Sequence, residues 1–326
     1  MSVAAGPYQA EVTAVEQYER QAARNPWLLL WDRLRKKRLA MLSLAIVIVI
    51  YGAGITAPLI APYSYTEQNL ERGLEGPSAD HWFGTDRLGR DMFSRVLYSA
   101  RTTLIVTAAV VLSGTLVLGN FLGLLAGYRG GWVDSLIMRI GDVFASLPGL
   151  PMLILLNATL LPRVLQLVGW FEDHTPVSGL SSSGTASYFT VFGALALFSW
   201  VGTARLIRAQ VLQLRERDFI LAAQATGGST IHIIWRHLLP NVSFLIILEI
   251  SAVLGAVAGS EILLTWFGVG VQPPNPSFGA MLFEGSGART FQAHPHLLLV
   301  PAAVVTSLMF AFALLGDALN DAVRGR

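Results

Sequence analysis

The sequence predicts an all-α polytopic membrane protein with six membrane-spanning helices. Three observations point to this fold class: 53% of the 326 residues are hydrophobic, only 13% are charged, and the mean hydropathy is +0.54. Soluble domains usually carry about 25% charged residues. The apolar runs approach the ~20 residues that cross a bilayer as a helix, and they are too long and too apolar for barrel strands.

The six apolar runs set the expected order of the elements, and each is long enough to cross a hydrocarbon core of ~30 Å. They cover residues 39–60, 102–126, 135–160, 188–211, 242–264 and 297–317. The expected organisation is an N-terminal tail (1–38), a first spanning helix (39–60), an external segment (61–100), a core with five further spanning helices (101–318) and a C-terminal end (319–326).

The distribution of basic residues predicts the orientation. The stretch "WDRLRKKR" (31–38) directly precedes the first span, which places the N-terminus in the cytoplasm. Six crossings return Arg324 and Arg326 to the same side. The external segment also contains several arginines, but the first basic cluster is expected to dominate.

A polar stretch, "DFILAAQATGGSTIHIIWRHLLPN" (218–241), lies between the fourth and fifth spans. Asp218 is a suitable N-cap for a helix over 219–226, and Gly227-Gly228 supplies a helix stop. Ser229 can cap a second short helix, which Pro240 is expected to end. The sequence therefore predicts a rigid helix–turn–helix just outside the bilayer, on the cytoplasmic side.

Three stretches on the other side differ in character. Residues 81–101, "HWFGTDRLGRDMFSRVLYSAR", are dense in charge and glycine, whereas 162–187 include the low-complexity run "SGLSSSGTAS" and are expected to be flexible. The prolines and glycines of "GVGVQPPNPSFGAML" (268–282) exclude a continuous helix over 268–290.

Several classes of function are excluded or disfavoured. The chain has no cysteine, so it has neither disulfides nor thiolate metal sites. A net charge of only +2 argues against a nucleic-acid partner. There is no glycine-rich phosphate loop and no serine elbow, so the chain is not expected to be an enzyme or to hydrolyse ATP itself.

The histidines give little support to a metal site. They are His81, His174, His232, His237, His294 and His296. The pair in "HPH" (294–296) has no nearby cysteine or paired acid, which favours a structural role. His232 and His237 are five residues apart, so an α-helix would not place them on one face. We expect no metal and no cofactor on this chain.

Acidic residues inside membrane segments often mark proton or ion routes. Glu249 and Glu261 are candidates for a translocation-path acid or a structural acid, and Glu249 is the better candidate for a functional one. Glu261 and Asp142 lie near span ends, where a salt bridge or snorkelling is expected. Small residues also recur, and the spacing of Gly114, Gly119, Gly123 and Gly127 places them on one helical face.

The polar stretch resembles the cytoplasmic coupling loop of ABC importer permeases, here residues 212–240. That pattern is Glu-Ala-Ala, three residues, Gly, then nine residues before Ile-x-Leu-Pro. Ala222, Ala223, Gly227, Leu239 and Pro240 match it. The expected Glu is Leu221 and the expected Ile is His237, so two positions depart from the pattern.

Other blocks make the resemblance more specific. "FGTDRLGRDMFSRVLYSAR", "AGYRGGWVDSLIMRIGDVFASLP" and "GVGVQPPNPSFGAML" resemble the dipeptide/oligopeptide permease family, C-type subunit. The resemblance covers about residues 30–323 in the expected order. The long N-terminal tail and the Ser/Gly-rich loop depart from it. It implies the type I ABC importer permease fold for residues 101–318.

The resemblance also implies a function and a set of partners. The chain would be the permease subunit of an ATP-driven importer of di- and oligopeptides in a bacterial or archaeal plasma membrane. It would pair with a homologous B-type permease and contact membrane lipid, two cytoplasmic ATPase subunits that hold ATP and magnesium, and an extracytoplasmic substrate-binding protein. The residues implied in ATPase coupling are Asp218, Ala222, Ala223, Gly227, Gly228, His237, Leu239 and Pro240, and the external motif is Gly84, Thr85, Asp86, Gly89, Arg90 and Asp91.

Three alternatives stay open from the sequence. The same machinery could import a nickel chelate, glutathione or another small solute. A membrane enzyme or quinone-binding subunit would use His294, His296 or Glu249, but it needs convergent ligands on facing helices. A secondary transporter driven by ions alone would show internal repeats and broken helices at matching positions, which the sequence does not display.

Overall fold

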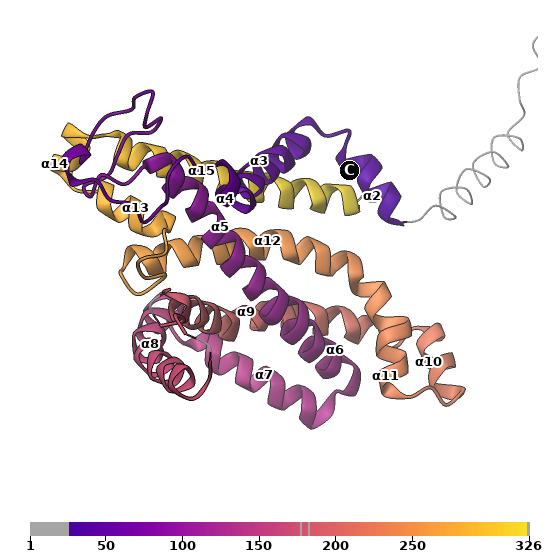
Figure 1. Ribbon diagram of the computed structural model, residues 1–326. Coiled ribbons are helices and arrows are strands. Elements are labelled where there is room, and N and C mark those ends of the chain that lie inside the picture. Colours follow the sequence, from indigo (N-terminus) through magenta and orange to yellow (C-terminus); the bar gives the residue numbers. More distant parts are fainter. Residues whose placement is uncertain (1–25, 177, 182, 325–326) are drawn as a thin grey trace, which may run out of the picture.

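A computed structural model describes residues 26–176, 178–181 and 183–324 of the chain. Its regular elements are helices, and the described residues form no strand beyond one isolated bridge between Thr85 and Asp91 (Figure 1). In chain order the elements are α2 (Pro26–Leu34), α3 (Arg38–Ile55), α4 (Ala57–Ile60), η1 (Leu70–Arg72), α5 (Met92–Val110), η2 (Val111–Gly119), α6 (Asn120–Arg129), α7 (Gly131–Ser146), α8 (Gly149–His174), α9 (Thr185–Leu214), α10 (Asp218–Ala225), α11 (Thr230–Ile233), η3 (Ile234–Leu238), α12 (Leu239–Trp266), α13 (Phe278–Gly285), α14 (Ala288–Ala293) and α15 (His296–Arg324).

Six helices are long and apolar enough to cross a membrane. They are α3, the continuous run α5–η2–α6, α8, α9, the continuous run α11–η3–α12, and α15. The predicted fold class, an all-α polytopic membrane protein with six spanning helices, is therefore confirmed.

The third span differs from the prediction of one helix over 135–160. Two helices occupy this region, α7 and α8, and they meet at Leu147-Pro148. Proline lacks the N–H that a helix interior needs, and it disfavours helical geometry in the residue before it. Leu147 is accordingly extended, with φ −81° and ψ 140°. Because α8 continues to His174 and α9 begins at Thr185, more than half of the stretch expected as a flexible loop (162–187) is helical.

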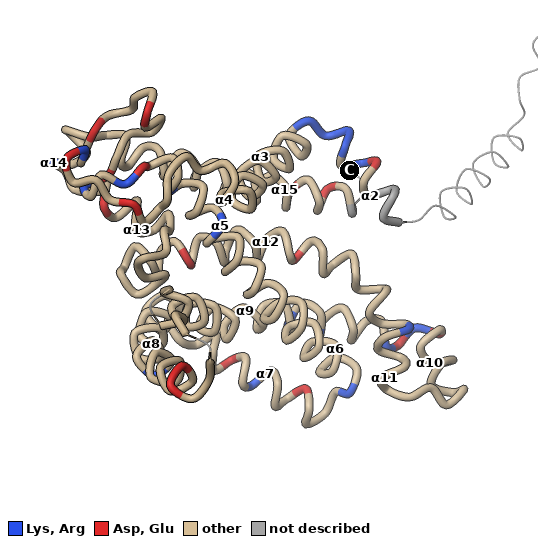
Figure 2. The backbone as a smooth tube through the Cα atoms, in the orientation of Figure 1, with Lys and Arg blue, Asp and Glu red and all other residues tan. Residues whose placement is uncertain are grey.

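The molecule has two ends, which we name the α10 end and the α13 end (Figure 1). α2, the last residues of α15, α10 and α11 lie at the α10 end, whereas residues 61–91, α13 and α14 lie at the opposite one. α2 and the start of α3 contact the end of α15, because Arg33 Nη1 donates to the Ala322 carbonyl at 2.7 Å and Lys37 pairs with Asp321 at 2.9 Å. The basic stretch between α2 and α3 therefore lies at the same end as the basic residues beside α10 (Figure 2).

The predicted glycine face packs within this chain. A Cβ at Gly119, Gly123 or Gly127 would come within 2.8 Å of a residue of α9, and Gly114 also lies directly against α9. The step from Gly114 to Gly119 is five residues, one more than an α-helical face allows. Residues 111–119 form a π-helix, whose wider turn accommodates that extra residue. The long α5–η2–α6 helix thereby keeps all four glycines against α9.

Candidate functional site

The predicted coupling loop (212–240) forms a helix–turn–helix at the α10 end. α9 ends at Leu214 and α10 begins at Asp218. The prediction that Asp218 is the N-cap is wrong. Arg217 occupies that position and makes no side-chain cap bond, and Asp218 is the first helical residue. A carboxylate there still favours the positive end of the helix dipole.

The predicted break at Gly227-Gly228 is confirmed. α10 ends at Ala225, and the Gly228 N–H donates to the Ala223 carbonyl at 2.9 Å. Gly227 has φ +81°, a backbone conformation that residues with a side chain rarely adopt. A Cβ at Gly228 would lie 2.7 Å from the Ala223 carbonyl oxygen. Both glycines are therefore required by the geometry of the turn.

The second helix begins as predicted but does not end as predicted. The Ser229 hydroxyl accepts a bond from the His232 N–H at 3.3 Å and caps α11. Pro240, however, lies inside a helix that runs without a break for 37 residues, Thr230–Trp266. The π-helical turn over 234–238 already interrupts the α-type hydrogen-bond ladder just before Pro240, so the missing N–H is tolerated. The second helix of the coupling loop is thus the start of the fifth span.

The inner face of this helix–turn–helix is anchored by three fully buried side chains. Ile220 of α10, Ile233 of α11 and Leu238 of η3 are each 0% exposed. They pack in one cluster with Ile207 and Val211 of α9. Burying each side chain is worth about 1.5–3 kcal/mol, so α10 is held firmly on the bundle.

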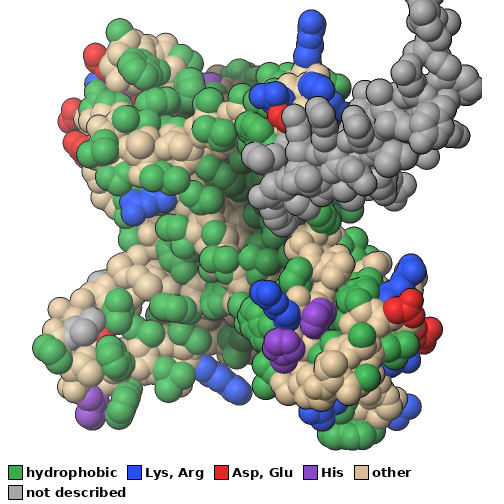
Figure 3. Space-filling model, turned by 90° about the vertical axis from the view of Figure 1, so that its right-hand side faces the viewer, with side chains coloured by type: hydrophobic (Ala, Val, Ile, Leu, Met, Phe, Trp, Pro, Cys, Tyr) green, Lys and Arg blue, Asp and Glu red, His purple; other side chains and the backbone are tan. Residues whose placement is uncertain are grey.

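The outer face of the same segment is also apolar. Phe219, Leu221, Ile231 and Trp235 are 41–71% exposed, and Ala222 is exposed beside them. A view onto the α10 end shows hydrophobic side chains and histidines on the lobe formed by these helices (Figure 3). Four large apolar side chains exposed on one helix–turn–helix indicate a contact surface for protein or lipid. Leu221, the position where a glutamate was expected, belongs to this surface.

His232 and His237 contradict the prediction that they do not share a face. Their ring centroids are 5.9 Å apart in an edge-to-face arrangement, and Phe219 of α10 lies 6.4 Å from His237. The π-helical turn brings residues five apart into register, which an α-helix would not do. The described residues contain no group of three or more metal-ligating side chains, here or elsewhere.

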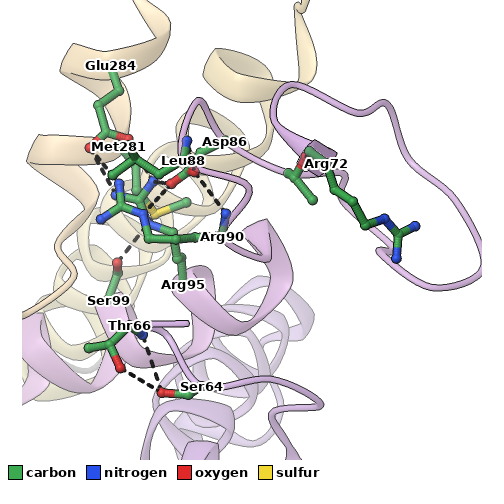
Figure 4. Close-up of polar contacts among 11 residues, drawn as sticks. Ser64, Thr66, Arg72, Asp86, Leu88, Arg90, Arg95, Ser99, Met281 and Glu284 are labelled. Atoms are coloured by element: carbon green, nitrogen blue, oxygen red, sulfur yellow. Dashed lines mark hydrogen bonds and ion pairs between the residues drawn. The ribbon is translucent and has the colours of Figure 1, made fainter. Parts of the chain in front are cut away.

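At the α13 end, a buried ion-pair network joins the external segment to α13 (Figure 4). Asp86 accepts from Arg90 Nε at 2.6 Å and from Arg95 Nη1 at 2.5 Å, and Arg95 also pairs with Glu284 of α13 at 2.6 Å. The side chains of Asp86 and Arg95 are each only 3% exposed. This network fixes Arg90 and Asp86 of the predicted external motif in a structural role.

The other residues of that motif shape the loop itself. Thr85 Oγ1 donates to the Arg72 carbonyl at 2.5 Å, and Gly84 and Gly89 have φ of +76° and +70°. Asp91 caps α5 by accepting from the Ser94 N–H at 2.7 Å. The motif therefore builds a compact loop.

Sequence reasoning missed Arg95 and Glu284. Arg95 lies inside the charged stretch 81–101, but nothing in that stretch marks its side chain as buried. Glu284 is the only acidic residue between Glu261 and Asp317. A single acid in one external segment, together with several arginines in the other external segment, is the signal that could have identified the pair Arg95–Glu284.

The acids of the fifth span differ from expectation. Glu261 makes no salt bridge with any described residue and is 0% exposed. Its carboxylate accepts from Thr103 Oγ1 at 2.9 Å and from Thr265 Oγ1 at 3.2 Å. Asp142, by contrast, forms the expected salt bridge, with Arg205 at 2.7 Å.

Glu249 lies at the edge of a cavity between α12 and α15. It accepts from Thr203 Oγ1 at 3.5 Å and is only partly buried. The cavity has a volume of about 500 Å³, and Asp317 and Asn320 line it together with Glu249. Of the two candidate acids, Glu249 is the one that a solute could reach.

A second cavity, of about 640 Å³, lies between α5 and α9 near the α13 end. Its lining includes five aromatic side chains, several aliphatic and small polar ones, and one arginine, Arg101. Thr102 of α5 and Tyr188 of α9 are hydrogen-bonded across its wall at 2.9 Å.

Most of the chain matches known protein families. Residues 119–326 match the family described as "Binding-protein-dependent transport system inner membrane component", and residues 25–77 match "N-terminal TM domain of oligopeptide transport permease C". Together the two matches include α3 and the coupling loop. They also include α9, which lines one cavity, and α12 and α15, which line the other.

Similar proteins cover nearly the whole chain. The dipeptide transport system permease protein DppC of Bacillus subtilis is 37% identical over 90% of this chain and 83% of its own length. The oligopeptide transport system permease protein OppC of the same organism is 35% identical over 91% and 90%. The glutathione transport system permease protein GsiD of Escherichia coli O157:H7 is 37% identical over 97% and 95%.

Proposed function

The chain belongs to the family of binding-protein-dependent transport system inner membrane components, and we propose that it imports di- and oligopeptides as one half of an ATP-driven translocation path. It is a multi-pass membrane permease with six helices of spanning length. The observation that carries the proposal is the helix–turn–helix at the α10 end, which exposes an apolar face. Its second helix continues without a break into the spanning helix Thr230–Trp266.

The continuous helix explains how a movement at α10 could reach the opposite end. Thr230–Trp266 has 37 residues, which corresponds to a helical path of roughly 55 Å at about 1.5 Å per residue, and the helix bends where α11 and the π-helical turn meet α12 (Figure 1). Near its far end, Glu261 is tied to Thr103 of α5, and Trp266 packs edge-to-face on Phe283 of α13. In this proposal a displacement of α10 is transmitted along this continuous helix to the α13 end.

The exposed apolar face of α10 and α11 supports docking to an ATPase subunit. Ala222 presents a small side chain that permits close approach of a partner groove, and Leu221 and Ile231 add apolar contact area. No acid stands at Leu221, so binding here rests on shape and apolar packing. In this proposal Gly227 fixes the angle between the two helices while the ATPase subunits hold ATP and magnesium.

The remaining partners follow from the two ends of the molecule. A homologous B-type permease would supply the other half of the path, and a substrate-binding protein would deliver cargo at the α13 end. The basic residues between α2 and α3 favour a cytoplasmic α10 end, with both termini inside. A bacterial or archaeal plasma membrane is the proposed location.

The names of the similar proteins support a peptide cargo. Two of them are called dipeptide and oligopeptide permeases, and a third is called a glutathione permease. Glutathione is itself a small peptide, so it is the favoured second candidate within the same chemical class.

Reconstitution tests the proposal. The complete complex in proteoliposomes, with its binding protein and a labelled dipeptide, should accumulate the peptide only with ATP. Co-purification should retain two ATP-hydrolysing subunits. Transport that persists on an ion gradient without ATPase subunits would contradict the proposal and favour a secondary transporter.

A further inference from the structure

We propose that Arg101, in the aromatic cavity between α5 and α9, binds the C-terminal carboxylate of the peptide during its passage. This inference rests on the proposed function and adds the chemical group that the path recognises. It concerns a site distinct from the coupling loop and from the buried network around Asp86.

Arg101 lies at the start of the second span, directly before the apolar run 102–126. It is nine residues after the first residue of α5, about 13 Å along the 38-residue helix Met92–Arg129. Arg101 is exposed, and no described acid lies within salt-bridge distance of it. The nearest buried arginine, Arg95, is paired with two acids.

Aromatic side chains surround Arg101 in this cavity. Tyr65, Tyr98, Tyr188, Phe189 and Phe192 line it together with Arg101. Tyr65 and Tyr98 pack with ring centroids 4.5 Å apart, and Tyr188 is held by its hydrogen bond to Thr102. The three tyrosine rings are therefore held in place, and the five rings form largely apolar walls around one positive charge.

The polarity of the cavity selects the ligand group. The described residues that line it include no Asp or Glu, so it offers nothing to neutralise an ammonium group. A guanidinium matches a carboxylate in a two-bond geometry, and such charge-assisted bonds are stronger between low-dielectric walls. Its volume of about 640 Å³ is within the about 300–1,000 Å³ typical of small-molecule sites. A short peptide with a free carboxylate fits these three properties.

The cavity also lies where cargo would enter. Pro58 of α4 and Asn275 and Pro276, before α13, contribute to its wall, so it belongs to the α13 end. Glu249 lines the other cavity, between α12 and α15, nearer the α10 end. The two cavities thus carry opposite charges at different depths of the protein.

The test is uptake by the complete complex in proteoliposomes, with the same binding protein throughout. Arg101→Gln should lower ATP-driven uptake of labelled Ala-Ala about tenfold or more, because it removes a charge-assisted bond. Arg101→Lys should restore part of the rate. Uptake of Ala-Ala amide should be the same in Arg101→Gln and in the unsubstituted complex. Arg139→Gln, on the exposed side of α7, is the control and should transport both peptides normally.

A second measurement covers the case in which the amide is a poor cargo. A photoreactive p-benzoylphenylalanine at Phe189 should become cross-linked to labelled Ala-Ala during turnover, and Arg101→Gln should abolish that label. The inference is overturned if Arg101→Gln moves Ala-Ala at the normal rate, or slows both peptides equally. It is also overturned if the label goes to lipid, or if Arg101→Gln releases the second permease. If the unsubstituted complex moves no peptide with ATP, the proposed function fails instead.

Discussion

Thr103 of α5 donates a hydrogen bond of 2.9 Å to the carboxylate of Glu261 on α12, and both side chains are 0% exposed. This bond joins the helix that follows the external segment to the helix that begins at the coupling loop. The described residues around Glu261 provide hydroxyl donors and no cation. The carboxyl group therefore acts as a hydrogen-bond acceptor between two spanning helices.

The first prediction concerns this acceptor. Glu261→Gln keeps a carbonyl oxygen for Thr103 and should cost no more than about 1 kcal/mol of unfolding free energy. Glu261→Ala leaves a cavity and unpaired hydroxyls, and should cost about 2–5 kcal/mol. Thermal unfolding in detergent, followed by tryptophan fluorescence, distinguishes them. Equal destabilisation by both variants would show that the charge itself is required.

The second prediction concerns the network at the α13 end. Asp86→Asn removes the carboxylate that Arg90 and Arg95 share. Breaking a buried ion pair should lower the free energy of unfolding by about 3–5 kcal/mol. Glu284→Gln should lower the free energy of unfolding by less, because the side chain of Glu284 is 36% exposed and water can replace its carboxylate as a partner of Arg95. The measurement is the unfolding temperature of each purified variant. The opposite order would mean that Glu284, and not Asp86, holds the external segment in place.

The third prediction concerns the contact between α6 and α9. A Cβ at Gly123 would lie 2.7 Å from the Ala204 carbonyl oxygen, so Gly123→Ala should destabilise the protein by about 1–3 kcal/mol. Gly202→Ala is a matched control within α9, because nothing lies within 4 Å of a Cβ there. The control should be neutral or stabilising, since alanine favours a helix interior. Similar losses in both variants would argue against close helix approach as the cause.

The fourth prediction concerns coupling. Ala222→Arg places a long cation on the exposed face of α10 without touching the buried cluster beneath it. Peptide uptake and peptide-stimulated ATP hydrolysis should both fall at least about tenfold, the effect of losing ~1.4 kcal/mol of binding. Gln213→Arg, exposed near the end of α9, is the control and should retain both activities. Membrane insertion should be normal in each. Unchanged uptake in the Ala222 variant would remove α10 from the coupling surface.

Hydropathy predicted the six spanning helices because burial in lipid imposes an apolar length on each helix. The Gly227-Gly228 turn and the Ser229 cap were also predictable, since each depends on the local chemistry of the backbone. These features are encoded within a few residues of one another.

Other features depend on packing between distant segments, and the sequence did not reveal them. Pro240 was expected to end a helix, but the π-helical turn before it lets the helix continue. Glu261 was expected to form a salt bridge or to snorkel near a span end, but it is buried and accepts a hydrogen bond from Thr103, 158 residues away along the chain. The pairing of Arg95 with Glu284 is equally remote in sequence. Only the folded bundle brings these partners together.

The most direct test of the central claim is a cross-link between α10 and an ATPase subunit. The chain has no cysteine, so Ala222→Cys provides a single defined thiol in the unsubstituted background. A short bis-maleimide applied to a complex whose ATPase subunit has one surface cysteine beside its docking groove should join the two chains. Gly76→Cys, exposed in the loop at the opposite end, should not react with that subunit. If an intact, transporting complex gave no cross-link from Ala222→Cys, or an equal yield from Gly76→Cys, α10 would not be the coupling helix.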